Sequence, residues 1–253
     1  QRPGGVETER VPTAWKEAGV GLVATYQTPA DAATETAQRI DVRYQARMPE
    51  AKMETLIGNL VDQTEHALDA GDYRYRVLLA DGKREIWRCV EEQTVFDDFV
   101  RVLDFYHATE HLSKGAEHLF GKGSDKAHAW YVKWRHKLAH DPDAVDHVLR
   151  SMRYYRSQLR PGSARYDSVT KEIGFFSNNR DKMDYAGYRA KGLPISSGPI
   201  EAACKTLVGH RLKRSGMRWT RQGGQQILNL RIHTQSHRFA EFWDRYIQHA
   251  DQR

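Results

Sequence analysis

An apolar run that ends abruptly in an acidic turn is the sequence feature that most constrains the fold of this chain. Residues Tyr73–Ala80 (YRYRVLLA) change from alternating to continuously apolar, which is typical of a strand entering a sheet covered on both faces. Asp81-Gly82 follows directly, so we expect a carboxylate at the carboxyl end of a strand, the edge where ligands gather in open α/β sheets. The pattern predicts an α/β core with a candidate site at Asp81, although Asp-Gly is also a common plain turn.

Further strands and a helix are predicted in the first half of the chain. Val20–Tyr26 and Ile40–Tyr44 are rich in β-branched and aromatic residues, as strands are. Met48–Leu68 has the apolar spacing of an amphipathic helix. The apolar segment Phe99–Phe105 predicts another strand, with Asp104 near its end. A second carboxylate is therefore expected at a strand end.

The second half of the chain has helical periodicity. Helices are predicted from His107 to about Arg160, where Asp141-Pro142 separates two of them, and again over Tyr166–Phe176. A last helix is predicted over Gly224–His249, with its apolar face packed on the sheet. Strands first, a helical block next and a final helix pair indicate an α/β core interrupted by a helical insertion.

The stretch Leu193–Trp219 (LPISSGPIEAACKTLVGHRLKRSGMRW) leads from a turn into a helix and then into a basic run. Pro199 suits the first helical position, and Glu201 falls in the first turn, near the positive end of the helix dipole. Such a carboxylate either satisfies free backbone N–H groups or holds a metal ion beside a surface that binds a phosphate backbone. The basic run contains Lys205, His210, Arg211, Lys213, Arg214 and Arg218, with Trp219 among them.

Composition is compatible with a nucleic-acid partner. The 253 residues carry 39 Lys and Arg against 33 Asp and Glu, a net charge of +6, together with six Trp and twelve Tyr. A modest basic excess is also common in proteins that never bind nucleic acid. The two cysteines, Cys89 and Cys204, suit a reducing compartment and exclude a disulfide framework. No apolar run approaches membrane-spanning length.

Two metal chemistries compete for the acidic and histidine residues. Asp81, Asp104 and Glu201 stand at element ends, and carboxylates converging from different elements are what a two-metal phosphoryl-transfer site needs. The rival is His107-Ala-Thr-Glu110-His111, which matches the H-x-x-E-H pattern of inverted zinc peptidases. There, both histidines would bind Zn²⁺, Glu110 would be the general base, and a downstream glutamate such as Glu172 would be the third ligand. A separate alternative is a non-catalytic zinc site that uses Cys89 with these histidines.

Several blocks together resemble the transposases of bacterial insertion sequences of the Kra-type group, which have a ribonuclease H-like DDE catalytic domain akin to that of Mutator-like transposases. The similar text is LLADG at 78–82, VLDFYHATEHL at 102–112, NNRDKMDYAGYRAKGLPISSGPIEAACKTLVGHRLKRSGMRW at 178–219 and GGQQILNLR at 223–231. The resemblance covers nearly the whole chain, and its third block is long and specific.

The resemblance implies DNA cleavage and strand transfer by two Mg²⁺ or Mn²⁺ ions held by two Asp and one Glu. Asp81 matches the second acid and Glu201 the third, with Asp104 and His107 as supporting site residues. The partners implied are transposon ends and target DNA, bound by a homo-oligomer in the nucleoid of a bacterial cytoplasm. The residues expected to contact DNA are Lys205, His210, Arg211, Lys213, Arg214, Arg218 and Trp219.

The resemblance also predicts the organisation of the chain and one departure from the family. Residues 1–112 would form the first part of the ribonuclease H-like core, 113–185 the helical insertion and 186–253 the C-terminal helices. The family's first Asp precedes the segment similar to VPTAWKEAGVGLVATYQ, and Asp31 and Asp41 come too late to replace it. We therefore expect an N-terminally truncated transposase with little or no activity. The alternative is a non-catalytic DNA-binding or domesticated transposase-derived module.

Overall fold

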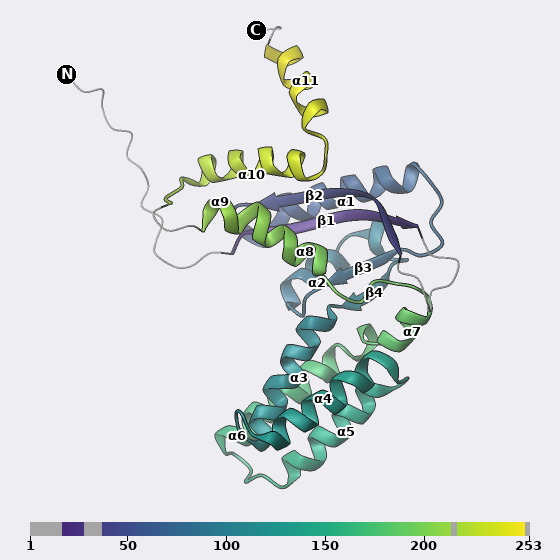
Figure 1. The fold of residues 1–253 in the computed structure, drawn as a ribbon, viewed down its shortest axis with the longest axis vertical. Coiled ribbons are helices and arrows are strands. Elements are labelled where there is room, and N and C mark those ends of the chain that lie inside the picture. Colours follow the sequence, from purple (N-terminus) through teal and green to yellow (C-terminus); the bar gives the residue numbers. More distant parts are fainter. Residues whose placement is uncertain (1–16, 28–36, 214–216, 251–253) are drawn as a thin grey trace, which may run out of the picture.

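The computed structural model describes residues 17–27, 37–213 and 217–250 and has a mixed α/β fold (Figure 1). Strands β1 (Gly19–Gln27) and β2 (Gln38–Arg47) form an antiparallel pair. Strands β3 (Val77–Ala80) and β4 (Val100–Leu103) form a separate parallel pair. Within the described ranges the inner edges of β1 and β3 have no strand partner. The predicted α/β class is confirmed.

Helix α1 (Glu54–Asp69) covers one face of the antiparallel pair at very short range. A Cβ atom at Gly19 or Gly21 of β1 would lie 2.6 Å from the side chain of Leu56 or Leu60, so a larger residue at either position would displace that leucine. The helix begins later than predicted because a 3₁₀ turn at Ala51–Met53 precedes it. Lys52 and Met53 within this segment have positive φ angles of 54° and 53°, which an α-helix does not allow.

Strands β3 and β4 are shorter than the apolar pattern predicted. The extended ladder starts only at Val77, and β4 ends at Leu103 because Asp104 begins a helix instead of continuing the strand. The Asp104 Oδ1 atom accepts a hydrogen bond from the Tyr106 backbone N–H at 2.9 Å, which is the contact of an N-cap residue. Helix α2 (Arg84–Glu91) connects the two strands and buries Trp87 against them.

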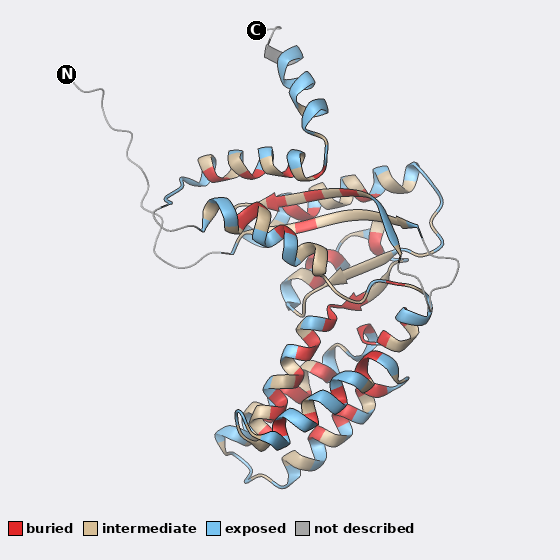
Figure 2. Ribbon diagram, in the orientation of Figure 1, coloured by how far each residue is buried: buried red, intermediate tan, exposed pale blue. Residues whose placement is uncertain are grey.

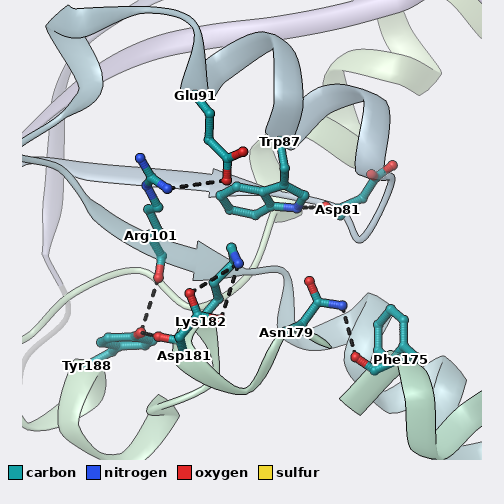
Figure 3. Close-up of polar contacts among 9 residues, drawn as sticks. All are labelled: Asp81, Trp87, Glu91, Arg101, Phe175, Asn179, Asp181, Lys182 and Tyr188. Carbon is teal, nitrogen blue, oxygen red and sulfur yellow. Dashed lines mark hydrogen bonds and ion pairs between the residues drawn. The ribbon is translucent and has the colours of Figure 1, made fainter. Parts of the chain in front are cut away.

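Four helices form a bundle below the parallel strands (Figure 1). They are α3 (Phe105–Phe120), α4 (Asp125–His140), α5 (Ala144–Ser157) and α6 (Ala164–Asn178). Their buried side chains form one apolar cluster that continues into β4 (Figure 2). The short helix α7 (Tyr185–Ala190) reinforces this connection, since the Tyr188 hydroxyl donates to the Arg101 carbonyl oxygen at 3.1 Å (Figure 3). The bundle is thus attached rigidly to the parallel strands.

The C-terminal helices cover the other face of the antiparallel pair. Helix α8 (Gly198–Ala203) continues through a π-helical turn (Cys204–Gly209) into the short α9 (His210–Leu212). Together with α10 (Arg221–Gln235), this segment buries apolar side chains against β2. The packing agrees with the prediction that the final apolar helix face covers a sheet.

The prediction of a single last helix over Gly224–His249 is wrong, because the chain forms two helices there. Helix α10 ends at Gln235, and α11 (Phe239–Ala250) leaves it in a new direction (Figure 1). His237 between them has a φ angle of 56°, and this left-handed conformation interrupts the helical hydrogen bonds. Only α10 packs on the strands.

Candidate functional site

Asp81 and Asp104 lie side by side at the carboxyl edge of the parallel strands. Ala80 pairs with Leu103 at the end of the ladder, so each acid directly follows the last paired residue of its strand. The Asp104 backbone N–H donates to the Ala80 carbonyl oxygen at 2.8 Å, which ties the two strand ends together. On the outer side, the Trp87 indole N–H donates to the Asp81 carbonyl oxygen at 2.7 Å (Figure 3).

A hydrogen bond between distant segments joins the helix that carries Glu201 to this edge. The Ser197 hydroxyl donates to Oδ2 of Asp104, and the Phe105 backbone N–H donates to the Ile195 carbonyl oxygen at 2.9 Å. Ser197 is the residue before α8, and Glu201 stands in the first turn of that helix. Through these two hydrogen bonds Asp104 connects the start of α3 to the start of α8.

The pKa of Asp104 is shifted mainly by its burial. Burial raises the pKa of Asp104 above its usual value, the backbone N–H of Tyr106 and Ser197 oppose that rise, and the Glu201 carboxylate adds to it. Glu201 itself is exposed. Asp81 and Asp104 thus lie at adjoining strand ends, whereas the convergence of Glu201 on both of them stays a prediction.

His107 stands behind the two aspartates on the first turn of α3. Burial lowers the pKa of His107, and His111 lowers it further, whereas Asp81, Glu110 and Asp104 raise it. The ring lies against the backbone at Gly82, where an added Cβ would come within 3.0 Å of its Nε2 atom and 2.6 Å of the Phe175 ring. Gly82 therefore allows α3 and α6 to approach the strand end that carries Asp81.

In the pattern that suggested a zinc peptidase, His111 contacts other side chains of the protein. The His111 Nδ1 atom lies 2.6 Å from Oε2 of Glu172, and its ring stacks on Phe175 with centroids 3.6 Å apart. Glu110, the required general base, points to solvent as an exposed residue. Cys89 is buried on α2, where its thiol contacts the Lys52 carbonyl oxygen. His111 and Glu172 thus act as a packed pair between α3 and α6.

The basic run, which follows Glu201 in the sequence, forms an exposed surface. Lys205, His210, Arg211, Lys213 and Arg218 are exposed, whereas Arg214 lies outside the described residues. Trp219 is 41% exposed, and its indole N–H donates to the Arg211 carbonyl oxygen at 3.1 Å. Cations and an accessible aromatic ring are thus presented together on the surface.

Two charged groups near Asp81 were missed by the sequence reasoning. Lys83 contacts the Glu17 carboxylate, which lowers the pKa of Glu17, and Asp81 helps to raise the pKa of Lys83. Lys213 at the end of the basic run also lowers the pKa of Glu17. The sequence did not predict the contact of Lys83 with Glu17, because it joins the residues before β1 to those after β3.

The donor atoms at this edge suit a hard divalent cation. Asp81 Oδ1 accepts a hydrogen bond from the Lys83 backbone N–H at 2.8 Å, while Oδ2 and the Glu201 carboxylate have no hydrogen bond or ion pair to another described residue. Mg²⁺ is often bound through one or two carboxylates and the substrate's phosphate. Among the residues that the structure describes, no three His, Cys, Asp or Glu side chains are grouped to hold a metal ion.

Comparisons with protein-family models, curated proteins and solved structures gave no match for this chain. In the described ranges, none of the helices is long and apolar enough to cross a membrane.

Proposed function

We propose that this chain is the catalytic part of a DNA transposase of the ribonuclease H-like DDE type, with Asp81 and Glu201 as two of its three metal-binding acids. The observation that supports the proposal most is that Asp81 and Asp104 end two paired strands, and that Ser197, just before the helix of Glu201, donates to Asp104. These segments are far apart in sequence, and the exposed basic run follows Glu201 along the chain. Both features are what phosphoryl transfer on DNA requires.

In this proposal Asp81 and Glu201 would hold Mg²⁺, which supplies a Lewis acid and activates the attacking water or 3′-hydroxyl. Asp104 does not act on the substrate. It fixes the start of α3 and, through Ser197, the position of the helix that carries Glu201. The exposed cations from Lys205 to Arg218 would hold the phosphate backbone of the DNA in register with the acids.

The proposal includes a third acid on a strand between β1 and β3. Such a strand would pair with the two inner edges and join both ladders into the five-stranded sheet expected of a ribonuclease H-like fold. No described residue of this chain takes that place. We therefore expect the chain by itself to cleave DNA slowly or not at all.

Nicking of supercoiled plasmid in Mn²⁺ tests this proposal. We would compare the chain with a form extended before Gln1 by a strand that carries an aspartate, each as wild type and as Glu201→Gln, with Glu65→Gln on the exposed side of α1 as the control variant. Cleavage by the longer form that is lost in Glu201→Gln and retained in Glu65→Gln supports the proposal. Cleavage that survives Glu201→Gln contradicts it.

A second candidate is a DNA-binding module without catalysis. The observation that favours it is the Lys83 cation, which lies close to Asp81 and contacts Glu17, and so partly neutralises the acidic edge. The salt dependence of DNA binding tests the DNA-binding surface that this module needs. Replacing Arg211 and Lys213 by Ala should reduce the slope of log K against log salt by about one for each lost phosphate contact, while Lys122→Ala between α3 and α4 should not. Binding without cleavage in both chain lengths would favour this module.

A further inference from the structure

A polar hollow opens beside β2, between α1 and α10. The two helices cover opposite faces of the antiparallel strands, and side chains from all three elements line the space, which has a volume of about 350 Å³. Binding sites for small molecules begin at about this size. Arg47 and Asp62 give the lining one charge of each sign, so its character is polar and close to neutral.

Carboxamide side chains form half of this lining, namely those of Gln45, Asn59, Gln63 and Asn229. Two hydrogen bonds fix their orientation. Asn59 Nδ2 donates to Gln45 Oε1 at 3.3 Å, and Gln225 Nε2 donates to Asn229 Oδ1 at 2.8 Å. Every carboxamide carries a donor beside an acceptor. This carboxamide hollow is therefore complementary to a planar ligand whose edge also places donors beside acceptors.

Two buried polar atoms of the carboxamide hollow lack a partner. In the part of the chain that the structure describes, Arg47 Nε and Gln63 Oε1 are the buried side-chain nitrogen and oxygen atoms without a hydrogen bond. The Glu50 carboxylate is 3.8 Å from Arg47 Nε, which is too far for a hydrogen bond. Leaving such atoms unpaired costs free energy. A ligand that offers an acceptor to Arg47 and a donor to Gln63 would remove this cost.

Arg47 also lines a second hollow, of about 410 Å³, between the end of β2 and the start of α10. Arg221 and Glu50 are the other charged residues of this arginine hollow, so its net charge is positive. Glu50 Oε1 already accepts a hydrogen bond from the Leu56 backbone N–H at 2.8 Å. Guanidinium groups bind phosphate through paired hydrogen bonds. The arginine hollow can thus take an anionic group directly beside the carboxamide hollow.

We propose that the two hollows together bind an adenine nucleotide, with the base in the carboxamide hollow and the phosphate between Arg47 and Arg221. Adenine places its N6 donor beside the N7 acceptor, and this is the pair that Asn and Gln side chains recognise through two hydrogen bonds. Ile232, the apolar residue of the lining, would contact the face of the base. The site contains neither Asp81 nor Glu201 and is independent of the proposed function.

Isothermal titration calorimetry of the full chain with adenosine monophosphate tests this proposal. We expect one site, which Gln63→Leu weakens at least about fivefold because an acceptor for the base is lost. Gln158→Leu, an exposed residue after α5, is the matched control and should bind as the wild type does. Circular dichroism verifies that both variants keep the fold. A wild type that does not bind, or binding that Gln63→Leu leaves unchanged, overturns the proposal.

Fragments of the ligand test the two halves of the site separately. Arg221→Ala should weaken adenosine monophosphate at least about fivefold and leave adenosine unchanged, whereas Arg150→Ala on α5 should affect neither. Inorganic phosphate that binds as tightly as adenosine monophosphate would show an anion site alone and overturn the proposal.

A short deoxyadenosine oligonucleotide distinguishes the source of the nucleotide. Tighter binding of the oligonucleotide, lost in Gln63→Leu, shows that the site holds one nucleotide of a strand. Equal or weaker binding shows that it holds the free nucleotide. The proposed adenine site stands in both cases, because each requires the Gln63 side chain.

Discussion

The Nδ1 atom of His111 on α3 lies 2.6 Å from Oε2 of Glu172 on α6. This contact holds two bundle helices together directly behind His107, whose ring is 5.0 Å from that of His111. The helical bundle is therefore packed against the acidic edge through His107. Substitutions in the bundle should affect the candidate site.

Glu172→Gln should lower the free energy of unfolding by about 1–3 kcal/mol, because it weakens a charge-assisted hydrogen bond at a largely buried position. Glu110→Gln, an exposed residue on α3, should change it by less than about 0.5 kcal/mol. Urea unfolding at neutral pH measures both. Equal stability of the two variants would show that the His111–Glu172 contact contributes nothing.

Gly82→Ala should destabilise the protein by about 1–3 kcal/mol, the usual effect of overfilling a packed site. Its Cβ would lie 2.6 Å from the Phe175 ring and 3.0 Å from His107, so one of these rings must move. Gly174→Ala in α6 is the control, since nothing lies within 4 Å of its added Cβ. That variant should be more stable by up to about 1 kcal/mol because alanine favours the helix. A neutral Gly82→Ala would contradict the close approach.

Gln225→Ala should expose the outer edge of β2. The Gln225 side chain accepts from the Met48 backbone N–H at 2.8 Å and donates to the Ala46 carbonyl oxygen at 3.1 Å, as a neighbouring strand would. We expect a loss of about 1–3 kcal/mol and faster aggregation, because a free strand edge pairs with other chains. Gln222→Ala, one turn earlier on the exposed surface of α10, should show neither change in thermal unfolding and light scattering.

The contact between α10 and α11 should weaken in acid. Burial lowers the pKa of His233, Arg245 lowers it further, and Glu241 opposes them. The unfolded chain, in which histidine titrates near about 6.5, then binds more protons than the folded chain, so stability falls as the pH falls from about 7 to 5.

The variant His233→Phe keeps an aromatic ring against Phe242 and removes the titrating group. Its melting temperature should depend less on pH than that of the wild type over this window, whereas exposed His66→Gln should follow the wild type. An unchanged pH dependence in His233→Phe would show that His233 does not titrate differently in the folded state.

The sequence by itself determined most of the elements and the acids at their ends. The apolar runs before Asp81 and Asp104 predicted strands that the structure contains, because a strand buried on both faces must be continuously apolar. The helical periodicity from His107 onward predicted helices that the structure contains, because each helix needs one apolar face at 3.6-residue spacing to pack. Pro199 and Glu201 correctly marked the start of α8.

Only the tertiary structure decided which distant groups meet and where the elements stop. The hydrogen bond from Ser197 to Asp104 and the contact of Lys83 with Glu17 join segments with no shared local pattern. The last helix breaks at His237 by a left-handed conformation that the apolar periodicity did not reveal. Local sequence sets the preference of each segment, but pairwise proximity depends on how the packed elements bring remote backbone and side chains together.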